Sequence, residues 1–273
     1  MQSLISVIIP VYNTGQSAVR LISTLLKDPY KNLEIIVVDD GSTDDSLNLL
    51  KSLQDSRLRI IHQTNSGASS ARNHGINISH GEYLIFIDSD DEVTKDFISD
   101  LVNTIKTPNT SIVATGYTYH RIKEQKTFPV AIKPMRLRRK RESLASYVIF
   151  SLSTDPRLYS SVNKIYHTNI IRQYNIKFDE KLNFAEDTKF VLDYLKHTKG
   201  EIRYVLKPAY IYHYGTPTST VKKSALKWSN WQKSYQNIKK WVGKNPTLKE
   251  KFWLLILLLR WRISYFRAVI ASR

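Results

Sequence analysis

The stretch Tyr83 to Glu92 reads Tyr-Leu-Ile-Phe-Ile-Asp-Ser-Asp-Asp-Glu, and it decides the fold. Five apolar residues without polar alternation predict a strand that is buried on both faces, as in a parallel sheet. Three aspartates follow, and an open α/β sheet binds its ligands outside the carboxyl ends of its strands. Clustered carboxylates repel one another unless a cation lies between them, and oxygen ligands suit a hard divalent ion. The alternative is a solvated, Asp-rich turn that caps a helix beginning at Val93.

The flanking sequence alternates between short apolar segments and helical periodicities. The segments predict strands over residues 6–11, 33–38, 58–61, 83–87, 111–116 and 202–205. Apolar residues at spacings of three and four predict helices around residues 18–26, 42–53, 68–78, 93–105, 144–152 and 186–195. This order predicts an α/β fold with a doubly wound, mostly parallel sheet flanked by helices. Residues 133–141, with six basic side chains, predict a solvated loop.

The last fifth of the chain has a different character. Two helices are predicted after residue 221, interrupted by Gly243-Lys-Asn-Pro246. The first carries an apolar stripe with three- and four-residue spacing, formed by Trp228, Trp231, Tyr235, Ile238 and Val242. A basic helix with tryptophan on one side is typical of a membrane interface. The alternatives are that the stripe packs on the rest of the protein, or that residues 254–259 pair helices between protomers.

Net charge is distributed unevenly along the 273 residues. Residues 1–100 hold 8 Lys/Arg and 14 Asp/Glu, a balance of −6, whereas residues 221–273 hold 13 Lys/Arg and one acid, a balance of +12. The two ends therefore predict two tasks, a cation-assisted site and an attachment surface for an anionic membrane. Nucleic acid is not expected as a partner because no binding motif accompanies the charge.

Cysteine content and hydropathy predict the cellular compartment of the protein. The chain has no cysteine, which excludes disulfides and thiolate–metal sites and favours a reducing compartment. The N-terminus lacks the basic and apolar regions of a signal peptide. The longest apolar run, Phe252 to Leu259, has eight residues, fewer than the ~18 of a spanning helix. We therefore expect a cytoplasmic protein, held peripherally at the inner face of the cell membrane.

A second carboxylate pair, Asp39-Asp40, also follows a predicted strand. The fold would bring it to the same sheet edge as Asp88, Asp90 and Asp91. One carboxylate there can accept hydrogen bonds from an imide or a ribose hydroxyl, while another binds a cation that bridges two phosphates. We therefore favour binding of a nucleoside diphosphate over simple helix capping.

Five motifs in this order resemble those of family-2 glycosyltransferases, over about residues 4–215. They are Ile8-Ile-Pro-Val-Tyr-Asn13, Val37-Val-Asp-Asp-Gly-Ser-Thr-Asp44, Asn65-Ser-Gly-Ala-Ser-Ser-Ala-Arg-Asn-His-Gly75, Ile87-Asp-Ser-Asp-Asp91 and Ala185-Glu-Asp187. The resemblance implies a GT-A fold and an inverting enzyme of the bacterial cell-envelope type that uses nucleotide-diphosphate sugars. It implies a nucleotide-sugar-binding half over residues 1–100 and an acceptor-binding half over residues 101–215. Residues 216–273 would form a basic, Trp-rich helical extension.

The resemblance also implies residue roles. Nucleotide-sugar binding falls to Pro10, Tyr12, Asn13, Asp39, Asp40, Arg72, Asp88 and Ser89, with Asp40 on the uracil ring. A Mn²⁺ or Mg²⁺ ion falls to Asp90, with Asp88, Asp91 and His213 as further candidates. Asp187 corresponds to the general base, supported by Glu186, and Lys164 to a residue facing the acceptor. For His213 a structural role is equally open, and Glu186 and Asp187 can also stabilise a helix N-terminus.

The function expected from these residues is transfer of one sugar, from a UDP-sugar, to a cell-envelope glycan or a lipid-linked acceptor. The absence of a Gln-x-x-Arg-Trp motif and of membrane spans disfavours a processive synthase. Two alternatives are a nucleotidyltransferase, which would need a Gly-rich triphosphate loop, and a catalytically silent membrane-associated subunit of the same fold. A homo-oligomer is also open.

Overall fold

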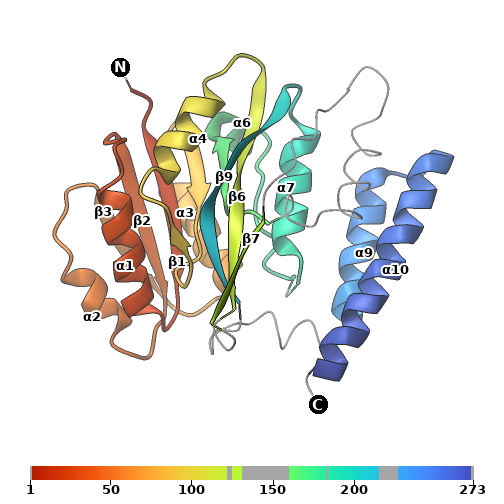
Figure 1. Ribbon diagram of the computed structural model, residues 1–273, viewed down its shortest axis with the longest axis horizontal. Helices are drawn as coiled ribbons and strands as arrows, with labels where there is room; N and C mark the ends of the chain where they lie inside the picture. The colour runs from red at the N-terminus through yellow and green to blue at the C-terminus, as the bar shows by residue number, and fades with distance from the viewer. Residues whose placement is uncertain (1, 122–124, 131–159, 183, 215–226, 272–273) are drawn as a thin grey trace. The chain divides into compact units, whose positions relative to one another are not determined.

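The computed structural model describes residues 2–121, 125–130, 160–182, 184–214 and 227–271 (Figure 1). The chain divides into two compact units. The first comprises residues 1–136, 162–177 and 198–218, and the second comprises residues 137–161, 178–197 and 219–273. The predicted loop at 133–141 and the predicted helix at 144–152 lie outside the described residues. The predicted division at residues 100 and 215 stays a prediction.

Nine strands of the described residues form one mixed sheet in the first unit. In chain order they are β1 Ile5–Val11, β2 Leu33–Asp40, β3 Leu58–Gln63, β4 Tyr83–Phe86, β5 Glu92–Val93, β6 Thr110–Arg121, β7 Lys126–Val130, β8 Lys164–His167 and β9 Glu201–Tyr214. The spatial order is β3-β2-β1-β4-β8-β6-β9-β5, with β7 beside β6. The half from β3 to β4 is parallel, and β8 joins β4 and β6 antiparallel. The predicted α/β class is confirmed.

The parallel half of the sheet contains the core and directs the carboxyl ends of its strands to one edge. Every residue of β1, β2 and β4 is buried. Ile8 of β1 pairs with Ile36 on one side and Phe86 on the other. The register also places Val11 beside Asp39, so that the segments after β1, β2 and β4 begin at neighbouring positions. The order in which the chain adds strands reverses between the parallel neighbours β1 and β4, and such a point is where these folds bind ligands.

Helices cover both faces of this sheet (Figure 1). The helices are α1 Gly15–Leu26, α2 Ser46–Lys51, α3 Ala68–Ile78, α4 Phe97–Ile105 and α6 Thr168–Gln173. The connection through α1 leads from β1 to β2, and the connection through α3 leads from β3 to β4 in the opposite direction across the sheet. Because such crossovers are right-handed, α1 and α3 lie on opposite faces. Asp28, after α1, accepts hydrogen bonds from Ile98 N and Ser99 Oγ of α4, so α1 and α4 share a face. Gly75 lets α3 approach β1, because a Cβ there would lie 2.4 Å from Ile8 Cγ2.

Two helices begin later than predicted. Ser42 does not open a helix, because its Oγ accepts a hydrogen bond from Asn13 N and α2 begins at Ser46. Val93 is not helical either: it lies in β5, where it pairs with Tyr210 of β9, and α4 begins at Phe97. In both places a contact with a segment distant in sequence replaces the local periodicity.

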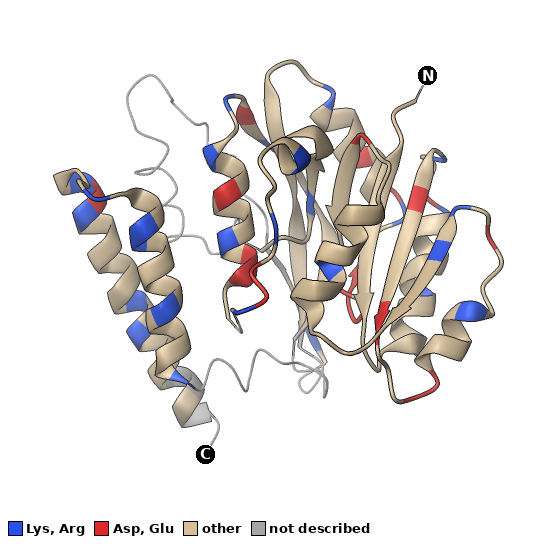
Figure 2. Ribbon diagram, turned by 180° about the vertical axis from the view of Figure 1, so that it is seen from behind, with Lys and Arg blue, Asp and Glu red and all other residues tan. Residues whose placement is uncertain are grey.

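The second unit contains α7 Glu186–Lys196, α9 Trp228–Val242 and α10 Leu248–Ala271. Trp241 Nε1 donates to Leu192 O of α7, and Ser234 Oγ donates to Phe184 O. Trp231 and Ile238 are buried, so the apolar stripe predicted to face a membrane packs inside the unit along much of its length. Among the charged residues of α9 and α10, lysine and arginine outnumber aspartate and glutamate (Figure 2). Within the described ranges no helix has an apolar stretch long enough to cross a bilayer.

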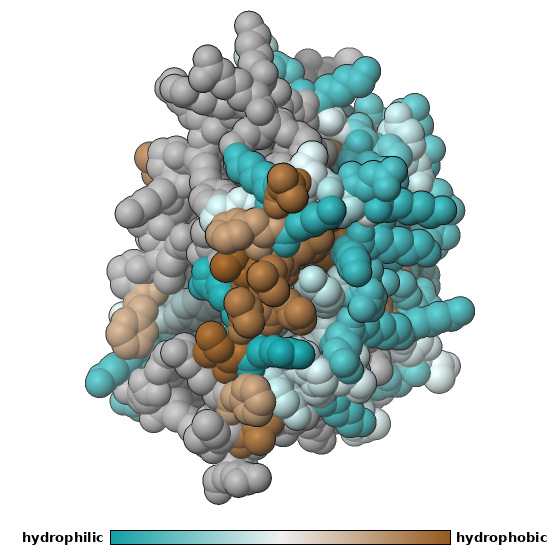
Figure 3. All heavy atoms as spheres, turned by 90° about the vertical axis from the view of Figure 1, so that its right-hand side faces the viewer, coloured by the Kyte–Doolittle hydropathy of each residue, from teal (hydrophilic) through white to brown (hydrophobic). Residues whose placement is uncertain are grey.

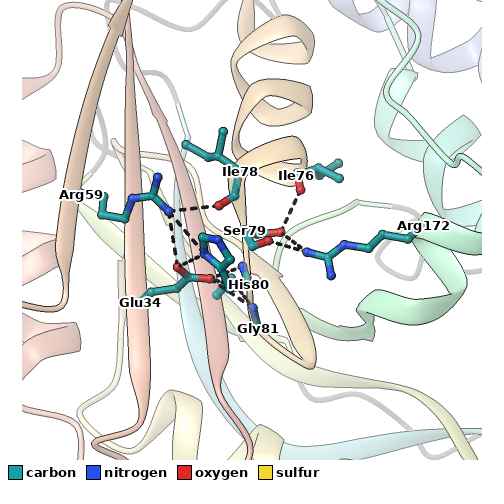
Figure 4. A network of polar contacts seen from close by, with 9 residues as sticks. Glu34, Arg59, Ile76, Ile78, Ser79, His80, Gly81 and Arg172 are labelled. Carbon is teal, nitrogen blue, oxygen red and sulfur yellow. Dashed lines mark hydrogen bonds and ion pairs between the residues drawn. The ribbon is translucent and has the colours of Figure 1, made fainter.

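A polar network ties together the amino ends of the parallel strands (Figure 4). Glu34 of β2 accepts hydrogen bonds from Ser6 Oγ, His80 N and Gly81 N. Its carboxylate also lies 3.8 Å from Arg59. Burial raises the pKa of Glu34, but the hydrogen bonds from Ser6 and His80 outweigh burial, and the net pKa is lowered. The ionised carboxylate therefore stabilises the sheet at the edge opposite the strand-end aspartates.

Candidate active site

The turn after β1 exposes an aromatic ring at the carboxyl edge. Asn13 has a left-handed backbone (φ 54°), and its Oδ1 accepts a hydrogen bond of 2.8 Å from Thr43 N. The β1 and β2 turns are thereby joined. Pro10 is buried in β1, whereas Tyr12 is 44% exposed. Of the three residues predicted in this turn, Tyr12 is thus placed to meet a ligand directly.

The two aspartates that end β2 have different partners. Asp39 is fully buried, and its Oδ2 lies 2.7 Å from His62 Nδ1 of β3. Asp40 Oδ1 accepts hydrogen bonds from Gln63 Nε2 (2.8 Å) and Ser66 N (2.9 Å), and its Oδ2 accepts one from Gly67 N (2.7 Å). Asp40 therefore holds the loop that opens α3, where a helix N-terminus favours negative charge. A carboxylate has about four acceptor positions; with three used, Asp40 can accept one further hydrogen bond.

The segment after β4 meets α3 through an ion pair. Arg72 Nη2 lies 2.6 Å from Asp88 Oδ1, and the arginine side chain is buried while that of Asp88 is 28% exposed. Ser89 Oγ and Thr14 Oγ1 share a hydrogen bond of 2.7 Å, which joins the β4 and β1 turns. The segments after β1, β2 and β4 and the start of α3 thus form one connected site. Asp40 and Asp88 lie at the same edge, as predicted, and Arg72 joins Asp88 there.

Asp91 points into the protein rather than along the rim. Its Oδ2 accepts a hydrogen bond of 2.6 Å from the Tyr210 hydroxyl, and its Oδ1 accepts one of 2.9 Å from His213 N. Burial, followed by the charges of Asp88 and Asp90, raises the pKa of Asp91 well above its usual range. Asp91 therefore holds β9 against the aspartate segment, and the three carboxylates form a crowded negative centre.

His213 lies beside the same aspartates. Its Nε2 is 3.3 Å from Glu92 Oε1, and its ring is 5.1 Å from that of His120. Burial lowers the pKa of His213, against the opposing charges of Glu92 and Asp90. The neutral imidazole is the form that ligates metals. The structure therefore places His213 beside Glu92 and Asp91, and its role as a metal ligand stays a prediction.

The acidic rim fits a divalent cation that is shared with a substrate. Among the described residues no group of three His, Asp or Glu side chains forms a complete metal site. Mg²⁺ in enzymes of phosphorylated substrates is held by one or two carboxylates together with phosphate oxygens. Burial raises the pKa of Asp91, and the charges of Asp88 and Asp90 raise it further; a cation beside these carboxylates would reduce their mutual repulsion. Asp88 and Asp90 are the carboxylates that fit this task.

Lys164 is buried at the start of β8. Its Nζ donates to Asn163 Oδ1 (2.7 Å) and Val162 O (3.3 Å), and Asn163 Nδ2 donates to Thr115 O. The side chain thus packs in the first unit beside the β6 strand. Facing an acceptor, the role implied for Lys164, stays a prediction.

Glu186 and Asp187 occupy the first turn of α7 in the second unit. Asp187 Oδ1 accepts a hydrogen bond of 2.6 Å from Ser161 Oγ. Ala185 precedes the helix with a left-handed backbone (φ 59°), which turns the chain sharply into α7. The Ser161 hydrogen bond therefore orients the Asp187 carboxylate at a helix N-terminus, a position that favours negative charge.

Residues 6–173 match the protein family described as Glycosyl transferase family 2. The chain belongs to this family. Glycosyltransferase GlyG of Streptococcus pneumoniae is 42% identical over 120 residues, which are 43% of this chain and 40% of GlyG. The uncharacterized glycosyltransferase EpsJ of Bacillus subtilis is 31% identical over 216 residues, which are 78% of this chain and 61% of EpsJ. The chain thus spans between two fifths and three fifths of the length of these relatives.

The solved structures include the same fold. TarS of S. aureus, residues 1–349, in complex with UDP-GlcNAc, aligns with 93% of this chain and 70% of its own length, at 24% identity and a TM-score of 0.68. The predicted GT-A fold is confirmed by this likeness.

Sequence reasoning missed several residues of this family-2 site. Gln63 donates a hydrogen bond to Asp40, and Thr14 shares one with Ser89. Tyr210, which is 119 positions away in sequence, donates a hydrogen bond to Asp91. The aromatic run that ends β9 was a visible signal for Tyr210, but nothing local indicates its partner. Gln63 could have been found from the parallel register, which pairs it with Asp40.

Proposed function

We propose that this chain is an inverting glycosyltransferase that moves a sugar from a UDP-sugar to a hydroxyl of a cell-envelope glycan or lipid-linked acceptor. The observation that carries the proposal is the connected rim of Asp40, the Arg72–Asp88 pair and Asp90 at the ends of β2 and β4. A buried, hydrogen-bonded carboxylate beside half-buried ones is what a nucleoside diphosphate and its cation require.

Donor binding would use the residues of the first unit. The exposed Tyr12 ring offers a stacking surface for a base, and Asp40 has one acceptor position left for an imide N–H. Asp88, oriented by Arg72, would accept from a ribose hydroxyl. Asn13, Asp39 and Ser89 would support these groups through their contacts with Thr43, His62 and Thr14.

Asp88 and Asp90 would hold Mn²⁺ or Mg²⁺ together with the diphosphate, with His213 beside them. When bound, such an ion neutralises the charge that develops on the leaving phosphate. Asp91 contributes by fixing β9, and hence His213, against this rim.

Asp187 would be the general base. As the acceptor oxygen attacks the anomeric carbon, its proton passes to the Asp187 carboxylate, and the bond from that carbon to the diphosphate oxygen breaks. Attack from the face opposite the leaving UDP inverts the anomeric configuration. A positioned base contributes ~10²–10⁴-fold to the rate. The Ser161 hydrogen bond supports this role because it orients the carboxylate, and the α7 N-terminus is a position that favours negative charge.

A cavity of about 400 Å³ in the second unit suits part of a glycan acceptor. Hydroxyl, amide, carboxylate and ammonium groups line it beside an indole ring, from Thr188, Lys189, Asp193, Asn237 and Trp241 among others. Sugars need donors and acceptors of this mixed kind. Its α7 residues lie on a different helical face from Asp187, so the cavity would hold sugars away from the reacting hydroxyl.

Residues 221–273 would hold the enzyme at the inner face of the cell membrane from the cytoplasm. The 13 Lys/Arg and single acid of this segment support the proposal, because each cation near an anionic surface contributes ~1 kcal/mol.

The test is a panel of UDP- and GDP-sugars, scored by thermal shift with and without Mn²⁺. A ligand that binds only the folded protein raises its melting temperature. We expect a UDP-sugar to give the largest shift, dependent on Mn²⁺. If no nucleotide sugar changed the melting temperature, with or without Mn²⁺, the result would contradict the proposal.

A further inference from the structure

Helix α10 has two apolar faces, and among the described residues only one of them is covered. Six large apolar side chains are 46 to 84% exposed along its length, at spacings of three or four residues, which places them on one helical face. We call this row the outer stripe; it consists of Leu248, Phe252, Leu255, Leu259, Ile263 and Phe266. Figure 3 shows the corresponding apolar strip on the surface of the protein.

The opposite face of α10 carries the packing of the second unit. Leu254 and Leu257 are buried, and the Trp261 ring packs edge-on against Trp231 of α9, with ring centroids 5.5 Å apart. Glu250 also faces inward and accepts a hydrogen bond from Thr247 N. The outer stripe is therefore not needed for the contact with α9.

The length of the exposed row sets it apart from ordinary surface residues. Scattered exposed leucines are ordinary, but contiguous apolar patches mark interaction sites. The outer stripe runs over 19 residues, which corresponds to roughly 28 Å of helix.

The charges beside the outer stripe identify its occupant. Helical geometry places Lys249 and Arg260 along one side of the stripe and Lys251 and Arg262 along the other. Glu250 is the one acidic residue in positions 221–273, and it is buried. An apolar stripe with cations along both margins is the pattern of a helix that lies in the interface of an anionic bilayer. A second copy of the chain would instead bring two surfaces of net positive charge together.

We propose that α10 lies in the headgroup region of an anionic bilayer, with the outer stripe buried among the acyl chains and the flanking cations at the lipid phosphates. The proposal deepens the membrane role given to residues 221–273 in the proposed function. It assigns the contact to α10, whereas the tryptophan stripe of α9 holds the unit together.

The experiment is co-sedimentation of the full chain with vesicles of phosphatidylglycerol and phosphatidylcholine, and with vesicles of phosphatidylcholine alone. Leu255→Glu places a charge in the outer stripe. Leu206→Glu is the matched control, because Leu206 is 56% exposed on β9 and Leu255 is 53% exposed. Size-exclusion chromatography reports the oligomeric state of each protein, and UDP titration reports the donor site separately.

We expect binding to the anionic vesicles that weakens with salt, a loss of roughly tenfold in Leu255→Glu, and no change in Leu206→Glu. Absence of binding to anionic vesicles, or equal loss in both variants, would overturn the proposal. So would a wild-type dimer that Leu255→Glu converts to a monomer, which would make a second copy the occupant. Vesicle binding without UDP binding would instead count against the proposed transferase and leave the membrane contact standing.

Discussion

Replacing Asp40 with asparagine tests whether this carboxylate organises the start of α3. Its two oxygens accept three hydrogen bonds, from Gln63 Nε2, Ser66 N and Gly67 N, and the residue is 3% exposed. An amide supplies one oxygen, so at least one of these part-buried hydrogen bonds loses its charged acceptor. Losing a hydrogen bond to a charged group costs about 1.5–3 kcal/mol, which corresponds to a fall in Tm of about 3–12 °C for a domain of this size.

Thermal unfolding followed by circular dichroism measures this shift, and UDP titration measures the second effect. Asp44→Asn is the matched control, because it removes the same charge from an exposed carboxylate that accepts one bond, from Ser46 N. We expect the control to stay within about 0.5 kcal/mol of wild type. We also expect Asp40→Asn to bind UDP at least roughly tenfold more weakly, since one hydrogen bond to a charged group contributes about 1.5–3 kcal/mol. An Asp40→Asn protein with wild-type Tm and UDP affinity would refute the reasoning.

Three further predictions follow from single side chains. Asp187→Asn retains an oxygen for Ser161, so we expect unchanged UDP binding but a fall of about 10²–10⁴-fold in kcat; undiminished turnover would exclude the base. The pKa of Glu34 is lower in the folded protein than in the unfolded chain, where it is about 4.3. Ionised Glu34 therefore adds to the free energy of unfolding above a pH of about 4.3, and this contribution is lost as the pH falls through the folded pKa. In urea unfolding at a series of acidic pH values, the free energy of unfolding of Glu34→Gln should therefore fall less with decreasing pH than that of the wild type. An equal fall in both proteins would contradict the prediction. Gly75→Ala should cost about 1–3 kcal/mol because its Cβ would lie 2.4 Å from Ile8 Cγ2; a neutral effect in the same assay would show that α3 can shift.

Local sequence was sufficient for the parallel half of the sheet. Apolar runs without alternation predicted β1 to β4, and α3 spans residues 68–78 as predicted. Because parallel strands end at one edge, the proximity of Asp40 and Asp88 could also be predicted. The antiparallel strand β8 could not, because Lys164-Ile-Tyr-His167 has no apolar run and its strand character comes from pairing with β4 and β6.

Long-range contacts decide the rest. Asp91 resembled its neighbours as a candidate ligand, but its direction depends on Tyr210 and His213, over a hundred residues later. Likewise α9 carries one apolar stripe and α10 carries two apolar faces, and sequence periodicity cannot say which of these faces is covered. The buried Trp231 and the exposed Phe252 show the outcome.

Calorimetric titration of UDP into the wild-type protein and Asp90→Ala, each with and without Mn²⁺, tests the strand-end site most directly. The proposed site predicts that UDP binds to the wild type, that Mn²⁺ tightens this binding, and that Asp90→Ala keeps metal-free binding but loses the Mn²⁺ effect. Failure of UDP to bind under either condition, or an equal Mn²⁺ effect in both proteins, would contradict it.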